Sequence, residues 1–378
     1  MKFDAGKLAR SVCKSFQPYV AGKPIETLKR ELGLKHIIKI ASNENPLGPS
    51  KKAVKAMKDI ADKVYFYPDF NSTELKTAIA KNYKMNLNNV IVGCGSDELI
   101  EIIARVFFNK EDEIVISKYA FTRYQMAVKI MDAKSVIVPM KEGFVHDLRA
   151  MAKACTKNTK AVFITNPNNP TGTYNTQKEF EAFLKALPTN KYGMKPLVIS
   201  DEAYHEYASF KKDLPDTIKL LKKYPNLIVL RTFSKIYAMA GARVGYGLSS
   251  PTVIDYIERV RPPFNLNKFA QAGAIASLAD KTQVSRSLKH NRTEVKFIFD
   301  ALKKMGIEYV DTVTNFFLMK VAPFKGKDIF NKMLREGVII RAMDEYDLPD
   351  YVRVTVGTRA ENKMFLDKIA KVMQKNKK

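Results

Sequence analysis

Residues 231–247 read RTFSKIYAMAGARVGYG and follow directly on an apolar run of β type. Lys235 therefore stands just beyond the end of a buried strand. Partial desolvation of a lysine favours the neutral amine, which can attack a carbonyl group. Thr232 and Ser234 place hydroxyls beside it, and Arg243 adds a guanidinium suited to a phosphate. A lone lysine in a loop is usually only solvated, but this set of neighbours indicates a covalent anchor with a phosphate clamp.

The order of apolar run, polar loop and helical pattern repeats along the middle of the chain. Apolar runs of β type lie at 89–93, 113–117, 135–139, 161–165, 196–200 and 227–232. Helical patterns lie between them, for example at 96–108 and 176–187. This alternation is typical of a mostly parallel sheet with helices on its faces. We therefore predict an α/β fold.

The pattern changes after about residue 265, where a long helical stretch leads to a β-type run at 315–321. A helix and two more β-type runs, 337–343 and 352–357, follow it. This order predicts a second, smaller α+β domain. We place the boundaries as an N-terminal segment that packs with the small domain (1–45), a large domain (46–265) and a small C-terminal domain (266–378).

The formal net charge of +25 raises the question of a polyanion partner. The lysines are spread through helical stretches such as KKAVKAMKDIADK (51–63) rather than gathered in one arm, and no nucleic-acid-binding motif accompanies them. Solvated helix faces are the simpler interpretation. We expect no nucleic-acid partner.

Cysteine usage and hydropathy indicate the compartment. Cys13, Cys94 and Cys155 are scattered and form neither a metal-ligand pattern nor a disulfide framework. No apolar run approaches the ~20 residues that span a bilayer, and residues 1–12 lack a signal-peptide pattern. We expect a cytoplasmic protein with no membrane partner and no metal.

Polar residues follow five of the predicted strands, at 94–98, 118–124, 166–172, 201–207 and 233–243. In a doubly wound sheet, ligands bind outside the carboxyl ends of the strands, so these segments are expected to converge. The first, CGSDE, is a glycine turn that opens a helix. Its free N–H groups suit a phosphate, although Ser96 or Asp97 as a simple helix cap explains it equally well.

Asp201 comes directly after an apolar strand and is expected to be partly buried. A buried carboxylate needs a cation or a strong donor, so it either caps a helix, forms a salt bridge or holds a proton on a heterocyclic nitrogen. Tyr204 would face the same way if a helical turn follows. A lysine, a carboxylate and a phosphate clamp are together what pyridoxal phosphate requires.

Several motifs carry a resemblance that covers nearly the whole chain. They are SNENPLGP (42–49), YPD (67–69), GSDE (95–98), Phe121-x-x-Tyr124, NPNNPTG (166–172), DEAY (201–204), TFSK (232–235), ARVGYG (242–247) and VRVTVGTR (352–359). In this order they resemble the fold-type I aminotransferases of class I/II. Within that family the chain is similar to the histidinol-phosphate aminotransferases, of which PYVAGKPIETLKRELGL (18–34) looks typical.

The resemblance implies pyridoxal 5′-phosphate as cofactor, held as a Schiff base by Lys235. Asp201 would pair with the pyridine nitrogen, and Lys235, Asp201 and Tyr204 would be the catalytic residues. Tyr204 and Asn169 would bind the phenolic oxygen, and Phe121 would stack on the ring. The implied phosphate ligands are Ser96, Asp97, Glu98, Thr232, Ser234 and Arg243. The loop amide of Asn169 and the ring of Phe121 also have plain structural explanations.

The resemblance also implies partners. Tyr67 would reach the cofactor of a neighbouring subunit, which implies a homodimer. Arg353 resembles the family arginine that binds the carboxylate of glutamate and, in this branch, the phosphate of histidinol phosphate. Arg341, Tyr19 and Asn45 are further candidates for the substrate pocket, although Arg341 could equally form a surface ion pair.

The leading hypothesis is a ping-pong aminotransferase of histidine biosynthesis. It would convert L-histidinol phosphate and 2-oxoglutarate into imidazole-acetol phosphate and L-glutamate. An aromatic amino-acid aminotransferase is the main alternative, and a pyridoxal-phosphate-dependent decarboxylase of amino-acid phosphate esters is another. A polyanion-binding protein would rest on the net charge alone.

Overall fold

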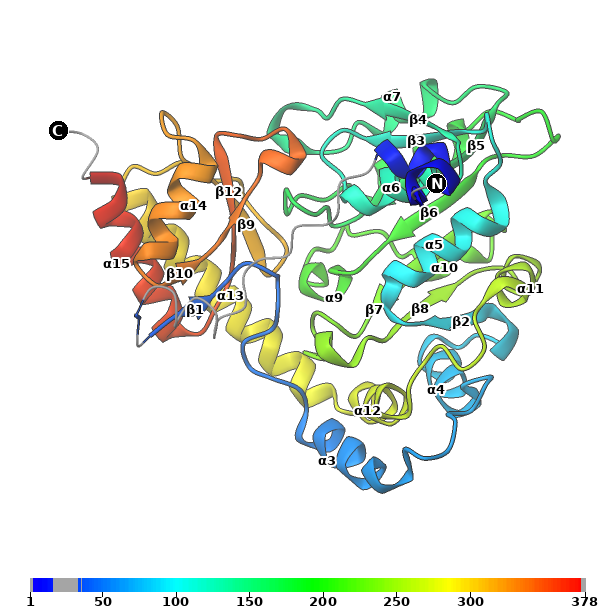
Figure 1. Ribbon diagram of the computed structural model, residues 1–378, viewed down its shortest axis with the longest axis horizontal. Helices are drawn as coiled ribbons and strands as arrows, with labels where there is room; N and C mark the ends of the chain where they lie inside the picture. The colour runs from blue at the N-terminus through cyan, green and yellow to red at the C-terminus, as the bar shows by residue number, and fades with distance from the viewer. Residues whose placement is uncertain (1–2, 16–32, 35, 375–378) are drawn as a thin grey trace.

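Strands that are apolar on both faces form the centre of the fold (Figure 1). The computed structural model describes residues 3–15, 33–34 and 36–374. Its main sheet has seven strands in the order β2-β8-β7-β6-β5-β3-β4. These strands are β2 (Val90–Gly93), β3 (Glu113–Ser117), β4 (Lys134–Val138), β5 (Thr159–Thr165), β6 (Leu197–Asp201), β7 (Leu227–Thr232) and β8 (Gly245–Leu248). The predicted α/β fold is confirmed.

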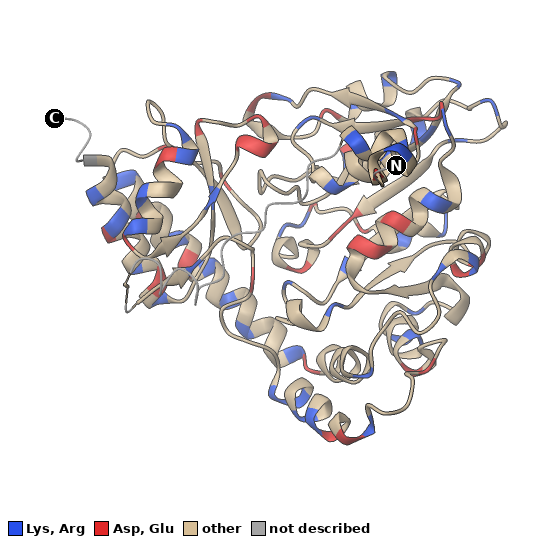
Figure 2. Ribbon diagram, viewed as in Figure 1, with Lys and Arg blue, Asp and Glu red and all other residues tan. Residues whose placement is uncertain are grey.

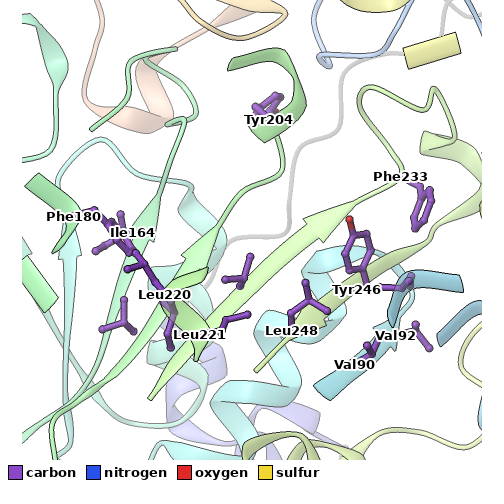
Figure 3. Packing of buried hydrophobic residues seen from close by; sticks show 14 of the residues in the cluster. Val90, Val92, Ile164, Phe180, Tyr204, Leu220, Leu221, Phe233, Tyr246 and Leu248 are labelled. Atoms are coloured by element: carbon purple, nitrogen blue, oxygen red, sulfur yellow. The ribbon is translucent and has the colours of Figure 1, made fainter. Parts of the chain in front are cut away.

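Helices cover both faces of this sheet. On one face lie α5 (Gly95–Phe107), α6 (Thr122–Ile130) and α11 (Pro251–Val260). On the other lie α3 (Lys51–Asp59), α4 (Thr73–Tyr83), α7 (Leu148–Lys153), α8 (Gln177–Ala186), α10 (Thr217–Leu221) and α12 (Lys268–Ala279). Side chains alternate between the two faces along each strand. Phe163 therefore packs in the first cluster, under α5, α6 and α11, while Val162 and Ile164 pack in the second cluster, on the opposite face. Figure 3 shows part of the second cluster, with Phe180 near Ile164.

The strand β8 runs antiparallel to both of its neighbours, β2 and β7. Its sequence, GYGL, lacks the run of β-branched residues that marks the other strands, and no strand was predicted there. A Cβ atom at Gly245 would overlap the backbone of Gly95 and the amide nitrogen of Ser96. Glycine therefore lets the first turn of α5 lie directly against the sheet.

A smaller sheet, β11-β12-β9, is antiparallel and stands beside the main one (Figure 1). Its part of the chain contains α13 (Lys281–Lys304), β9 (Phe316–Lys320), α14 (Gly326–Arg335), β10 (Val338–Ile339), β11 (Arg341–Ala342), β12 (Tyr351–Thr355) and α15 (Arg359–Gln374). The single run predicted at 337–343 is two short strands, because β10 pairs with β1 (Ile38–Lys39) while β11 pairs with β12.

The domain boundaries stay a prediction, but two contacts bear on them. The strand β1 joins the N-terminal segment to the small part through β10. The helix α12 packs against α3 and α4 of the large part, which favours a second boundary near the start of α13. The remaining elements are α1 (Ala5–Leu8), α9 (His205–Ala208), and the 3₁₀ turns η1 (Ser11–Ser15), η2 (Ala61–Lys63), η3 (Leu87–Asn89), η4 (Glu142–Phe144), η5 (Ala240–Ala242) and η6 (Asp344–Tyr346).

Lysine and arginine residues are spread over the helices and loops of both parts (Figure 2). Many of them form ion pairs within or between surface segments, as Lys296 does with Asp300 one helical turn away. Within the described ranges, no helix is both long enough and apolar enough to cross a membrane.

A buried ion pair ties β7 to the chain that leaves β6. The side chains of Arg231 and Glu202 are only 6% and 2% exposed. Arg231 donates to Glu202 Oε2 from Nε at 3.1 Å and from Nη2 at 2.8 Å. Its Nη1 donates to Tyr83 Oη at 3.0 Å, and that hydroxyl lies 2.6 Å from Tyr246 Oη. Because Glu202 follows Asp201 and Arg231 precedes Thr232, this pair holds two strand ends in register.

Replacing Glu202 with Gln should strongly destabilise the protein, because it leaves the buried charge of Arg231 without its counter-ion. Breaking a buried pair from one side costs about 3–5 kcal/mol. Urea unfolding at fixed protein and cofactor concentration measures the loss. Asp300→Asn, which breaks an exposed helical pair, should change the free energy of unfolding by about 0.5 kcal/mol at most. Equal effects of the two substitutions would contradict this assignment.

Candidate active site

A cavity of about 310 Å³ lies where the two parts of the chain meet. Three strands of the main sheet, β5, β6 and β7, end at it, the segments that follow β2 and β3 also line it, and β11 and β12 contribute from the small sheet. The strand order reverses between β5 and β3, which is the kind of switch point where open α/β sheets bind ligands. The convergence of strand ends expected from the sequence is therefore present.

Lys235 reaches this cavity from the loop after β7. Its Nζ donates to the carbonyl oxygen of Ser42 at 3.3 Å and stands 5.6 Å from the centre of the Tyr204 ring. Burial, assisted by the positive charge of Arg353, lowers the pKa of Lys235 to about 8. About a tenth of the amine is therefore neutral at pH 7, far more than for an ordinary lysine, and the neutral form is the one that acts as a nucleophile or base.

Asp201 is buried at the end of β6. Its Oδ2 accepts from Tyr124 Oη at 2.7 Å, and its Oδ1 accepts from the backbone of Ala203 at 3.1 Å. Thr165 in turn donates to Tyr124 Oη at 2.9 Å. Burial raises the pKa of Asp201 to about 6, while the hydrogen bond from Tyr124 works against that rise. The carboxylate is thus oriented by donors and stays mostly ionised above pH 6.

Tyr204 directly precedes α9 as its N-cap and is held by a residue from the N-terminal segment. Its Oη accepts from Asn43 Nδ2 at 2.9 Å. Asn43 adopts the left-handed conformation (φ 57°), which asparagine tolerates better than most residues. Burial raises the pKa of Tyr204 to about 12, so the phenol keeps its proton. Because its oxygen accepts from Asn43, that proton can be donated to a ligand.

Asn45, which the sequence analysis chose from the same motif, does not line the cavity. Its Nδ2 donates to the carbonyl oxygen of Ile236 and to Ser287 Oγ, both at 2.9 Å. It therefore ties the N-terminal segment to the Lys235 loop and to α13. Nothing in the motif SNENPLGP distinguishes the two asparagines, because both are polar residues in one loop.

Arg353 supplies positive charge from β12. Its Nη1 donates to Asn169 Oδ1 at 2.6 Å and its Nη2 to the carbonyl oxygen of Ala41 at 2.8 Å. Its Nε is buried without a hydrogen-bond partner among the described residues. The neutral oxygens fix the guanidinium without cancelling its charge, which suits an anionic ligand.

The predicted phosphate ligands gather around the first turn of α5. Thr232 Oγ1 donates to Ser234 Oγ at 3.0 Å, and both hydroxyls line the cavity with Arg243. Gly95 has φ +80°, and a Cβ atom there would overlap the Arg243 guanidinium. The arginine thus lies directly over the glycine turn, beside the N–H groups at the helix start, where a phosphate binds favourably.

Most of the predicted site residues line the cavity. These are Ser96, Asp97, Phe121, Asn169, Asp201, Tyr204, Thr232, Ser234, Lys235, Arg243, Arg341 and Arg353. Besides Asn45, two lie outside it: Glu98 Oε2 accepts from the backbone of Cys94 at 2.7 Å and from Asn265 at 2.6 Å, and Tyr67 stacks on Phe264 with ring centroids 4.7 Å apart. Tyr19 lies outside the described residues.

The cavity wall also contains residues whose roles the sequence did not indicate, namely Asn43, Thr122, Tyr124, Thr165, Glu345 and Tyr346. The role of Tyr124 could have been predicted, because it belongs to the Phe121-x-x-Tyr124 motif and the buried carboxylate of Asp201 needs a hydrogen-bond donor. Glu345 and Tyr346 lie in no motif, so their place in the cavity wall is known only from the folded structure, in which η6 packs against the cavity.

The cavity fits pyridoxal phosphate. It holds an amine of lowered pKa, an ionised carboxylate and a phosphate cradle, the three groups that this cofactor needs. The cradle is the deciding observation, because the missing side chain of Gly95 lets the Arg243 guanidinium lie directly against the first turn of α5. Among the described residues, no three histidine, cysteine, aspartate or glutamate side chains come together as a metal site would require.

Comparison with known proteins agrees with this geometry. The model of the family "aminotransferase class I and II" matches residues 35–369. Histidinol-phosphate aminotransferase 1 of Nitrosococcus oceani is 43% identical over 97% of both chains. The histidinol-phosphate aminotransferase of Akkermansia muciniphila is also 43% identical, over 94% of this chain and 96% of that protein.

A solved structure extends the likeness to three dimensions. The histidinol-phosphate aminotransferase of Sinorhizobium meliloti, crystallised in complex with pyridoxal-5′-phosphate, matches with a TM-score of 0.87 at 27% identity. The match covers 97% of both chains. The chain therefore belongs to the class I and II aminotransferases, among the histidinol-phosphate aminotransferases of that family.

Proposed function

We propose that the protein transfers the amino group of L-histidinol phosphate to 2-oxoglutarate. The products are imidazole-acetol phosphate and L-glutamate, and the step belongs to histidine biosynthesis. The observation that carries the proposal is the guanidinium of Arg353, held by neutral oxygens in the same cavity as Lys235. Both partners of the exchange bring an anionic group to the site, a phosphate in one half of the reaction and carboxylates in the other.

Bound pyridoxal phosphate supplies an electron-withdrawing ring that stabilises the charge left when a proton leaves the substrate carbon. Lys235 Nζ, whose lowered pKa makes part of it neutral, removes that proton from the first substrate. In the second half of the reaction it delivers a proton to the corresponding carbon of the other substrate. The carbonyl oxygen of Ser42, 3.3 Å away, restrains the position of Nζ.

Asp201 holds a proton on the ring nitrogen of the cofactor. The donors on both of its oxygens, Tyr124 and the backbone of Ala203, fix the plane of the carboxylate. Tyr124 is thus a positioning residue, since it acts through Asp201. The Tyr204 hydroxyl would donate a hydrogen bond to the phenolic oxygen of the cofactor, and Asn169 would add an amide whose own oxygen is already bound by Arg353.

The phosphate of the cofactor binds at the start of α5. Thr232, Ser234 and Arg243 contribute side chains, and Ser96 and Asp97 contribute backbone N–H groups at the positive end of the helix. Glu98 serves this cradle indirectly, because its carboxylate accepts from the backbone of Cys94, just before the glycine turn.

The active form is a homodimer in which Tyr67 reaches the cofactor phosphate of the partner subunit. Tyr67 is 79% exposed in the single chain, and Tyr65 and Phe66 beside it are also exposed. A run of exposed aromatic residues is typical of an interface. The protein acts in the cytoplasm, consistent with its three free cysteines, and cell fractionation tests that location.

The substrate is tested by comparing kcat/KM for L-histidinol phosphate and for phenylalanine, with 2-oxoglutarate as acceptor. We expect the phosphate ester to be preferred by about a hundredfold, because each additional charge-assisted contact is worth about 1.5–3 kcal/mol. A preference for phenylalanine would instead identify an aromatic aminotransferase. Because L-histidinol phosphate has no carboxyl group, the decarboxylase alternative is tested with an amino-acid phosphate ester instead, and release of CO₂ from it without formation of glutamate would identify a decarboxylase.

The pKa of Lys235 gives a pH signature in the protein stripped of cofactor. With a pKa of about 8, the neutral amine makes up about a tenth of the total at pH 7 and about nine tenths at pH 9. The rate at which pyridoxal phosphate is captured should therefore rise about tenfold over this range and then level off. An ordinary lysine would gain about a hundredfold over the same interval without a plateau.

Borohydride reduction of the holoenzyme identifies the lysine directly. The reduced cofactor should remain on the peptide that contains Lys235, and recovery on another peptide would disprove the assignment.

The dimer is tested by light scattering and by one substitution. The wild-type protein should have about twice the mass of the 42.9 kDa chain. Tyr67→Phe should stay dimeric but bind pyridoxal phosphate about tenfold more weakly, because it loses a hydrogen bond to a charged group. Tyr256→Phe, which removes an exposed hydroxyl on α11, is the matched control. A monomeric wild type, or an unchanged affinity in Tyr67→Phe, would count against the shared site.

A further inference from the structure

Two arginines of the cavity stand directly opposite each other. In the antiparallel pairing of β11 with β12, Arg341 is the partner of Arg353, and both line the cavity. Directly opposite like charges destabilise a sheet. This arrangement therefore needs an anion, either from the protein or from a ligand.

Among the residues that the structure describes, a carboxylate is hydrogen-bonded to one of the two arginines, Arg341. Arg353 is held by the neutral oxygens of Asn169 and Ala41. Arg341 instead donates to Glu345, from Nε to Oε1 at 3.2 Å and from Nη2 to Oε1 and Oε2 at 2.7 and 2.8 Å. Glu345 stands on η6 and also lines the cavity.

The Arg341–Glu345 pair remains accessible to solvent. The two side chains are 22% and 39% exposed, so the pair is held more weakly than a buried one would be. An incoming anion can therefore take the place of the Glu345 carboxylate without leaving a buried charge unpaired. Arg353 has less than a tenth of its surface exposed, and within the described ranges it donates to the neutral oxygens of Asn169 and Ala41 rather than to a carboxylate.

The charges give the cavity two states. When Glu345 is paired with Arg341, the charges of Arg341, Arg353 and Glu345 add up to +1. This charge matches a single carboxylate bound at Arg353. With Arg341 turned to the ligand, two guanidinium groups face it. A phosphate ester carries about −1.5 to −2 at pH 7 and offers three acceptor oxygens, so it uses both.

We propose that Glu345 is a specificity-determining residue that acts through Arg341. By holding Arg341 or releasing it, Glu345 sets the charge that the cavity presents and so adjusts it between carboxylate and phosphate ligands. The inference rests on the proposed function, since it explains how one site accepts both partners of that exchange.

Glu345→Gln tests this role, because it removes the competing charge and keeps the shape of the side chain. Each amino donor is given alone to the holoenzyme, and the single half reaction is followed through the cofactor's absorbance. We expect the second-order rate constant for L-histidinol phosphate to rise about tenfold and that for phenylalanine to change by less than about twofold. A purely structural role of Glu345 would lower both constants together, and that result would overturn the proposal.

Two further variants isolate the effect. Glu308→Gln removes an equal charge from the exposed Glu308–Lys320 pair in the small part of the chain, and it should leave both rate constants unchanged. In an Arg341→Met background, Glu345→Gln should no longer alter the ratio of the two constants, because the two residues act as one unit. An unchanged effect in that background would also overturn the proposal.

A binding measurement separates this inference from the proposed function. Titration calorimetry of the holoenzyme compares phenyl phosphate with phenylacetate, which share an aromatic ring and differ in their anionic group. Glu345→Gln should tighten phenyl phosphate about tenfold and change phenylacetate by less than about twofold. If L-histidinol phosphate is not a substrate but this shift occurs, the proposed function fails and the charge selection stands. Equal changes for both ligands would overturn the charge selection.

Discussion

Desolvation at the carboxyl edge of the main sheet is the constraint on which the chemistry of the site depends. The strand β7 is buried along its whole length and β6 at every residue after Leu197, so the polar side chains at their carboxyl ends emerge into a poorly solvated space. The same burial acts in opposite directions on acid and base. It lowers the pKa of Lys235 to about 8 and raises that of Asp201 to about 6. Burial thus brings the pKa values of both groups closer to 7.

The surrounding contacts decide how far each shift goes. Asp201 is kept ionised by a phenol and a backbone N–H rather than by a cation, so its negative charge remains available to a ligand. Arg353 is held by amide and carbonyl oxygens, so its positive charge remains available as well. The recurring principle is orientation by neutral groups. Arg341 departs from it, because its carboxylate partner moderates its charge.

The sequence predicted the parts of the fold in which one physical signal dominates. Strands buried on both faces are continuous apolar runs, and β3, β5, β6 and β7 were located to within two residues. The strand β8 was missed because its role in packing requires glycines, which weaken the β signal. The run at 337–343 was taken as one strand because pairing partners, here β1 and β12, cannot be known from local pattern.

The site was predictable to the same degree. Lys235, Asp201 and the phosphate cradle follow buried strands, so position and residue type pointed to them. The choice of Asn45 instead of Asn43 shows the limit, since hydrogen bonds across 161 and 312 positions of the chain select the latter. Glu345 gave no signal at all, because its importance comes from standing near an arginine that faces another arginine across a strand pair.

The position of Asn43 also has a mechanical consequence. Its side-chain nitrogen donates to Tyr204 on the main-sheet side, while its side-chain oxygen and backbone nitrogen bond Thr355 at the end of β12. Arg353 is carried on that same strand. A displacement of the small sheet therefore reaches the phenol by two routes, the hydrogen bonds of Asn43 and the edge-to-face packing of Tyr204 on Phe316 of β9, whose ring centroids lie 4.9 Å apart. Asn43 thus couples the position of β12, which carries Arg353, to the position of the Tyr204 hydroxyl.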